Sequence, residues 1–513
     1  MLLLMTTLTA FASAPLIPCG TPQQSSHYLS HPVRPPGPPV TDLVVRDSHG
    51  DIPNIITSDH FALKWGPDLV LTEAQSSEMI GYLEYAWDNQ VLEWEMEDPT
   101  GVGGTYFNVY IGDTGGAVPS VYGSAGYFTT DDDGYPMIVL ANFLHEDPPY
   151  AESVIVHEFF HAVQYKTGSF WVWETGGWFW EATATWAQGE LTTHWAYYSF
   201  LPFYAVRPDS GLYHHSTESH GGAPPDLHQY GAFIFPRYLS EHLGQGEVIL
   251  NAWRSGETEG DPVEILQDLL TEEVFSAALA DHAAHNLRWD YADGEGYAAH
   301  VGEVATWWPE TDHRVTNLQP HEDPEWQTIP SDHVPQACGY NLIPLSSDVL
   351  EGDQLTFAVR QDVPDTVSTS VNFRATIVEV NDGVPTYHST DPDQSHTVLT
   401  VNPEAELWAA VANVTSLGDI RGTRAYKVRF TPPPDPPPTD TGDPQTDTGT
   451  PGDTGTDPDT EDEEIAGHTE LGNADSGEKP SGCACSATNG SRSMGWLVLL
   501  PLIAIRRKAP RNK

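Results

Sequence analysis

The chain has 513 residues, and its 73 Asp and Glu side chains outnumber 22 Lys and Arg side chains, which gives a formal net charge of −51. This length allows two or three domains. The excess of negative charge argues against nucleic acid or an anionic lipid surface as the main partner.

The N-terminal stretch predicts a segment that directs secretion. Residues 1–14 form an apolar run that ends in a cleavage site of the A-x-A type, so we expect a signal peptide. A lipobox ending at Cys19 is an alternative that the preceding residues fit poorly, and a buried helix is disfavoured by the proline-rich sequence that follows. Residues 15–54 are expected to form an extended arm or a trimmed pro-segment.

Alternation and helical periodicity then predict the first folded elements. Thr72 and Gln75 form a plausible capping box at the start of a helix. A strand at the edge of a cleft could pair with an extended peptide substrate. The expected elements are a strand over residues 55–66, a helix over 72–95, and strands over 105–113 and 136–142.

An acidic cluster, Asp131-Asp132-Asp133-Gly134, precedes the last of these strands. The full calcium-loop pattern of an EF-hand is absent. We therefore favour a solvated turn over a calcium site.

The most informative motif lies on a helix expected over residues 152–167. His157 and His161 are four residues apart, so both imidazoles can face one metal ion. Glu158 lies between them and can reach a water molecule at that metal. Nineteen residues separate His161 from Glu181, a spacing that suits a carboxylate ligand from the following helix. Three such ligands with a fourth position for water are typical of catalytic zinc.

The surroundings of the motif favour a metal over a structural role. The helix is apolar on most sides, which predicts that it is buried. Burying two histidines and a glutamate without partners costs roughly 2 kcal/mol or more for each group. The alternatives are histidines that are hydrogen-bonded to the core and an ion pair for Glu181. No Lys or Arg lies between Lys166 and Arg207, which makes the ion pair a weak alternative.

Two segments, HEFFHAVQ and GWFWEATATWAQ, resemble the gluzincin group of zinc metallopeptidases. The stretch from Tyr230 to Gly244 is similar to a segment of hyicolysin-like members. The resemblance implies zinc ligands at His157, His161 and Glu181, with Glu158 as general base. It also implies an α+β fold whose zincin-like catalytic domain combines a mixed sheet with helices. At Thr185 the chain departs from members that carry an Asp there to support a ligand histidine.

A peptidase also needs a donor for the developing oxyanion. Residues 189–229 are rich in Gly, Pro and His and are expected to form a loop along the cleft. Tyr230 is the first candidate for the donor and His228 the second. An aromatic residue that packs on the core is an equally good interpretation of Tyr230.

The remainder of the folded region divides in two. Residues 230–289 are expected to be mostly helical and residues 292–333 irregular, which completes a catalytic domain over 55–333. Residues 334–432 alternate at short spacing, with a turn at Asn381-Asp382-Gly383, and predict an antiparallel β-sandwich. Cys19 and Cys338 could form a bridge between the arm and this second domain.

The C-terminal part has the composition of a linker followed by an anchor. Residues 433–481 are acidic and low in complexity and cannot bury a core. Residues 482–513 contain Cys483 and Cys485, an apolar run of twelve residues and a basic cluster. This segment resembles the MYXO-CTERM class of sorting signals, which implies processing and anchoring at the bacterial cell surface, at the outer membrane. A plain membrane anchor is the alternative.

Together these observations predict a secreted, surface-anchored zinc metallopeptidase that hydrolyses peptide bonds. We favour an endopeptidase, because no acidic motif for holding a substrate N-terminus is evident. Two other functions remain open. One is a non-catalytic surface binding protein with a structural zinc site, and the other is a zinc hydrolase of non-peptide amides.

Overall fold

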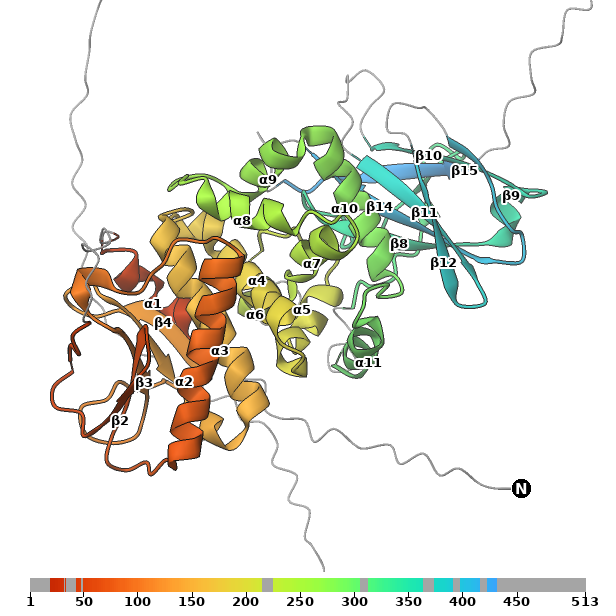
Figure 1. Cartoon of the computed structure of the whole chain (residues 1–513). Helices are drawn as coiled ribbons and strands as arrows, with labels where there is room; N and C mark the ends of the chain where they lie inside the picture. The colour runs from red at the N-terminus through yellow and green to blue at the C-terminus, as the bar shows by residue number, and fades with distance from the viewer. Residues whose placement is uncertain are drawn as a thin grey trace, which may run out of the picture. The chain divides into compact units, whose positions relative to one another are not determined.

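The structure is a computed structural model that describes residues 19–31, 33, 43–47, 49–214, 225–304, 312–362, 373–390, 397–415 and 422–430. These residues all lie in one compact unit, Met1–Pro437, which combines helices with mixed and antiparallel sheets (Figure 1). The predicted signal peptide, the acidic linker and the sorting tail lie outside the described residues. Among the helices that the structure describes, none is long and apolar enough to cross a membrane.

The N-terminal part is built on a five-stranded mixed sheet. Its order is β1-β2-β3-β5-β4, and the three central strands run parallel. The edge strands β1 and β4 run antiparallel to their neighbours. The strands are β1 (Asn54–Thr57), β2 (Phe61–Trp65), β3 (Phe107–Ile111), β4 (Gly126–Thr130) and β5 (Pro136–Leu140). All side chains of β2 to β5 are buried, as expected for strands covered on both faces.

Several predicted elements near this sheet need correction. The strand expected over 55–66 is a hairpin, because the polar residues Ser58 to His60 form a turn in which the Ser58 amide donates to the Phe61 carbonyl at 3.0 Å. Sequence analysis missed β4 altogether. The capping box of Thr72 and Gln75 is confirmed at the start of α2 (Glu73–Trp87), which continues as a π-helix over Asp88–Glu93.

The acidic cluster after β4 is a turn, as predicted. The Asp131 carboxylate accepts hydrogen bonds from the amides of Asp133 at 2.9 Å and Tyr135 at 3.0 Å. Arg46 forms ion pairs with both Asp131 and Asp133. These carboxylates therefore have partners within the chain.

Two long buried helices pack against each other behind the sheet. Helix α3 (Pro148–Thr167) starts four residues before the predicted position, because Asp147 caps it and Pro148 suits its first turn. It ends where Gly168 adopts a φ of 71°. Helix α4 (Trp173–Leu191) buries most of its length, including its central tryptophans. Helix α3 contacts β4 and β5, so the sheet and α4 enclose it.

The expected arm contains a helix. Residues Thr21–Tyr28 form α1, which packs along β4 (Figure 1). Tyr28 is fully buried, with its ring edge-on to Phe128 at 5.4 Å between centroids. The prediction of an extended arm was therefore wrong for this segment, which is helical and is anchored to the core by Tyr28.

Short helices follow α4, and they correct two predicted loops. Part of the loop expected over 189–229 is helical, and α11 lies within the stretch expected to be irregular. The elements are η4 (Trp195–Tyr198), α5 (Leu201–Ala205), α6 (Pro225–Gly231), α7 (Ile234–Glu241), α8 (Gly246–Arg254), α9 (Pro262–Leu270), α10 (Glu272–Asn286) and α11 (Gly294–Val304).

The C-terminal part consists of two antiparallel sheets with a shared apolar cluster that includes Ile343, Phe357, Ile377 and Val428. The predicted turn between β11 and β12 is confirmed, with positive φ at Asp382 and Gly383. The strands are β6 (Gln319–Pro320), β7 (Gln327–Thr328), β8 (Tyr340–Leu345), β9 (Leu350–Glu351), β10 (Gln354–Gln361), β11 (Phe373–Asn381), β12 (Val384–Ser389), β13 (Thr397–Thr400), β14 (Glu406–Asn413) and β15 (Tyr426–Phe430). Helix α10 packs on β11 and β14.

Candidate metal centre and cleft

The structure brings together the three predicted metal ligands. On α3, His157 and His161 place their Nε2 atoms 3.1 Å apart. Glu181 on α4 lies opposite, with Oε2 3.3 Å from His157 Nε2 and Oε1 3.5 Å from His161 Nε2. His161 and Glu181 are fully buried. One helical turn on α3 and one position on α4 are thus sufficient to form a compact group of nitrogen and oxygen donors.

Gln164, which sequence analysis did not identify, orients one of these histidines. Its side-chain nitrogen donates to the Trp180 carbonyl at 3.0 Å and to Thr183 Oγ1 at 2.9 Å. Its Oε1 must therefore accept, and it lies 2.7 Å from His161 Nδ1. Since Nδ1 carries the proton, Nε2 is the atom of His161 that can bind a metal. The spacing of three residues on α3 was the available signal for this support.

The charges of the group also fit a bound cation. Burial disfavours the charged form of Glu181, but His161 and His157 outweigh burial and lower the pKa of Glu181 to about 2. Burial likewise opposes the charge of His161, whose pKa is nevertheless raised by Glu181. Glu181 Oε1 is buried and has no hydrogen bond to any residue that the structure describes. A divalent cation would satisfy this oxygen and both Nε2 atoms together, and zinc favours such donors.

Cys19 is an additional donor that sequence analysis did not place here. Its Sγ atom lies 3.7 Å from His161 Nε2, and ligand atoms of Cys19, His157, His161 and Glu181 all lie within 4.8 Å of one another. The predicted bridge to Cys338 is wrong, because both cysteines are buried and free. An isolated cysteine in an arm that precedes a three-ligand motif was the only signal for this contact.

Glu158 points into the same site from α3. Its Oε2 atom accepts a hydrogen bond from Thr21 Oγ1 at 3.1 Å and lies 3.4 Å from Cys19 Sγ. Burial raises the pKa of Glu158. Strand β4 closes this side at Gly126, where an added Cβ would lie 3.1 Å from Glu158 Cγ. The absence of a side chain at Gly126 leaves room for Glu158.

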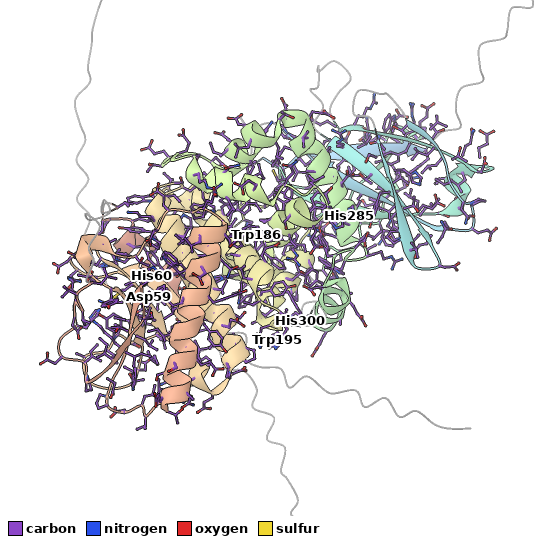
Figure 2. The ribbon with its side chains drawn as sticks, in the orientation of Figure 1. Asp59, His60, Trp186, Trp195, His285 and His300 are labelled. Atoms are coloured by element: carbon purple, nitrogen blue, oxygen red, sulfur yellow. The ribbon has the colours of Figure 1, made fainter. Side chains whose placement is uncertain are left out.

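His157, His161 and Glu181 are called the metal group below, because they are the candidate metal ligands. A cavity of about 280 Å³ opens beside this group. His157 and Glu158 form its polar end, while Trp195 and Phe200 contribute aromatic surface. Trp195, labelled in Figure 2, lies near His300, with 6.3 Å between ring centroids. The lining residues are Cys19, Ala125, Asp147, Tyr150, Val154, His157, Glu158, Thr185, Gln188, His194, Trp195, Ala196, Tyr197, Ser199, Phe200 and Tyr230.

The two predicted oxyanion donors differ in position. Tyr230 lines the cavity, and its hydroxyl donates to the Cys19 carbonyl at 3.1 Å. Its ring centroid is 6.4 Å from that of His157. His228 is buried, with Nδ1 3.2 Å from the His214 carbonyl, and is not among the described residues that line the cavity. Tyr230 is therefore the better placed candidate.

A second group of possible metal donors lies elsewhere and is less complete. His313, Asp332 and His333 have ligand atoms within 4.8 Å of one another, but Asp332 is exposed. Both rings already have partners, since His313 Nδ1 lies 3.2 Å from Asp209 and His333 Nδ1 lies 3.0 Å from Thr316 Oγ1. Each imidazole ring therefore has a partner within the chain without an ion.

The comparisons with known proteins add one finding. A family model described as a family of unknown function, DUF6055, matches residues 41–408. No curated protein matches the chain.

Proposed function

The chain belongs to the DUF6055 family of unknown function, and from the site it carries we propose that it is a zinc-dependent peptidase. The observation that carries this proposal is the buried group of His157, His161 and Glu181, with Glu158 beside it at the end of a cavity. We infer that the mixed sheet and α3 are the zincin-like catalytic part, and that the two C-terminal sheets form the predicted β-sandwich.

A zinc ion held by these three side chains would polarise the substrate carbonyl and lower the pKa of a bound water to about 7. Glu158 takes the proton released in the attack on the carbonyl carbon and returns it to the leaving amine. Burial raises the pKa of Glu158, and a shift in this direction favours proton uptake by the carboxylate. Thr21 and Gly126 define the space in which this carboxyl moves.

The remaining residues of the cleft bind and orient the substrate. Tyr230 presents its hydroxyl to a peptide carbonyl, as it does to that of Cys19. Strand β4 is an edge strand, so its backbone can pair with an extended peptide. Trp195 and Phe200 provide an apolar wall for a substrate side chain. Secretion and anchoring at the cell surface, at the outer membrane, remain proposals that rest on the sequence of residues 1–14 and 482–513.

The decisive experiment compares the Glu158→Gln protein with the Glu152→Gln protein, whose change lies on the same helix but outside the cavity. Casein and a peptide library are digested with and without a chelator, in the unchanged chain and in a Cys19→Ala background. We expect Glu158→Gln to lower the chelator-sensitive rate at least about 100-fold while the zinc content stays unchanged. Equal rates for Glu158→Gln and Glu152→Gln would reject the peptidase.

One observation favours a second function. Cys19 completes a set of four protein donors, which is the composition of closed, structural zinc sites. The chain would then be a non-catalytic binding protein, and no variant would hydrolyse any substrate. A library of non-peptide amides in the same digest tests the third possibility, an amide hydrolase.

A further inference from the structure

The segment that begins at Cys19 occupies the open edge of the sheet. The Gly20 amide donates to the Gly126 carbonyl at 2.8 Å. The Phe128 amide donates to Thr21 Oγ1 at 2.8 Å. Both contacts use backbone groups of β4, the edge strand to which an extended substrate would bind. Residues 20 and 21 therefore fill the position that a substrate backbone needs.

The same segment contacts the groups assigned to catalysis. Cys19 Sγ lies at the metal ligands, 3.7 Å from His161 Nε2. The Cys19 carbonyl accepts from the Tyr230 hydroxyl at 3.1 Å, and Thr21 Oγ1 donates to Glu158 at 3.1 Å. In the proposed reaction, Tyr230 would bind the substrate carbonyl and Glu158 the attacking water. The segment thus engages the metal group, the oxyanion donor and the general base together.

The residues of this segment that make these contacts are part of the packed core. Thr21 and Tyr28 are fully buried, and Cys19 is 7% exposed. Tyr28 contacts Trp180 on α4, with 5.5 Å between ring centroids. The Cys19 side chain also belongs to an apolar cluster with Phe200, Phe203 and Tyr230. Releasing the segment would therefore expose aromatic surface as well as the metal group.

We propose that the Cys19 thiolate is the fourth ligand of the metal and that residues 19–31 hold the cleft closed to substrate, a proposal that rests on the peptidase function given above. The donor set supports it. Two imidazole nitrogens, one carboxylate oxygen and one thiolate sulfur are all zinc ligands, and four of them complete a tetrahedral site. Glu181 Oε1 is buried in this group, 3.5 Å from His161 Nε2 and without a hydrogen bond to any described residue, which is a second observation in favour of a cation between these atoms.

The first experiment identifies the ligands without measuring activity. X-ray absorption on the zinc protein should show one sulfur at about 2.3 Å in the full chain. The cobalt-substituted protein should show a thiolate-to-metal charge-transfer band. Both signals should disappear in Cys19→Ala and persist in Cys338→Ala, which removes the other buried free cysteine. Identical spectra for the full chain and Cys19→Ala would overturn the proposal.

A second measurement uses the unchanged chain and so does not depend on how a variant folds. The native protein is alkylated with iodoacetamide with and without a chelator, and the labelled cysteines are mapped. Metal removal should raise the labelling rate of Cys19 about tenfold or more and leave that of Cys338 unchanged, because only Cys19 loses a metal bond. Equal labelling of Cys19 with and without the metal would overturn the proposal.

Hydrolysis then separates the two proposals. Cys19→Ala should hydrolyse peptides at least about tenfold faster than the full chain, the factor that corresponds to about 1.4 kcal/mol. If the full chain shows a sulfur ligand but Cys19→Ala hydrolyses no peptide, then Cys19 is a metal ligand and the proposed peptidase function is rejected. If the full chain and Cys19→Ala hydrolyse peptides equally fast and no sulfur ligand is found, the proposal that residues 19–31 close the cleft is rejected and the peptidase function is kept.

Discussion

Two buried groups of carboxylates and histidines differ in how their charges are satisfied. Asp209 accepts hydrogen bonds from Nε and Nη2 of Arg207, at 3.0 and 2.7 Å, and lies 3.2 Å from His313 Nδ1. Glu181 is paired only with two histidines in the described part of the chain, and one of its oxygens has no hydrogen-bond partner. Both oxygens of Asp209 are therefore hydrogen-bonded, whereas one oxygen of Glu181 is left for a ligand to satisfy.

The difference shows how a structural group can be distinguished from a functional one. A buried carboxylate stabilises a fold only when its charge is compensated and its oxygens are hydrogen-bonded. Asp209 meets both conditions within the chain and lies away from the cavity. Glu181 has one buried oxygen without a hydrogen bond to any described residue, and its partner His157 lines the cavity. The incomplete group is therefore the candidate for chemistry.

Metal removal should expose the largest difference between the two groups. At a free zinc concentration a thousandfold above Kd, the metal would stabilise the fold by about 4 kcal/mol, because it binds the native state alone. We expect a chelator to remove this stability from the full chain. Glu181→Ala should already lack it and show no response to the chelator. Differential scanning calorimetry measures both, and a chelator response retained in Glu181→Ala would place the metal elsewhere.

Replacing Asp209 should destabilise the fold by an amount that depends on pH but not on metal. Burial raises the pKa of Asp209, but His313 and Arg207 outweigh it and lower this pKa from 3.8 to about 2. Its contribution, about 2 kcal/mol, is complete above pH 4 and is lost as the pH falls towards 2.

Urea unfolding of Asp209→Asn at several pH values tests this expectation. The loss relative to the full chain should be about 2 kcal/mol at neutral pH and should shrink below pH 4. Asp312→Asn is the control, because Asp312 forms a more exposed ion pair with Arg314 that is expected to contribute less than about 1 kcal/mol. A loss for Asp209→Asn that stays constant down to pH 2 would contradict the compensated charge.

The ligand triad could be predicted from sequence because its geometry is mostly local. Residues four apart on a helix share a face, so His157 and His161 required no knowledge of the tertiary fold. Glu181 required only that the next helix pack against the first. The helix α2 with its capping box and the turn at Asp382 were predictable for the same reason, since each depends on neighbouring residues.

The rest of the site depends on contacts that are distant in the sequence. Cys19 meets His161 across 142 positions, and the contact exists because α1 packs on β4. Strand β4 was itself missed, so nothing in the sequence indicated where the arm would bind. A search for pairs of cysteines then suggested Cys338, although the better partners of Cys19 were imidazole and carboxylate side chains.

Changing Gln164 should lower the affinity for the metal without removing a ligand. Gln164→Leu retains much of the volume but loses the hydrogen bond to His161 Nδ1, which fixes the ring orientation. Loss of such a support typically reduces metal affinity ten- to 100-fold. Competition with a chromophoric chelator measures the affinity. Gln188→Leu is the control, because Gln188 binds Ser153 at 2.7 Å on the same pair of helices, and an equal loss in both variants would indicate a general packing defect.

The smallest expected effect concerns Tyr230. It distinguishes a role in catalysis from a role in metal binding. Tyr230→Phe removes only the hydroxyl that donates to the Cys19 carbonyl, so the ring still packs on Phe200. In the Cys19→Ala background we expect kcat for peptide hydrolysis to fall about tenfold or more, with zinc affinity unchanged, because the developing negative charge loses a donor. KM should change little, since the ground-state carbonyl needs this donor less than the transition state does. A change in KM alone would make Tyr230 a substrate-binding residue, and an unchanged kcat would remove it from the reaction.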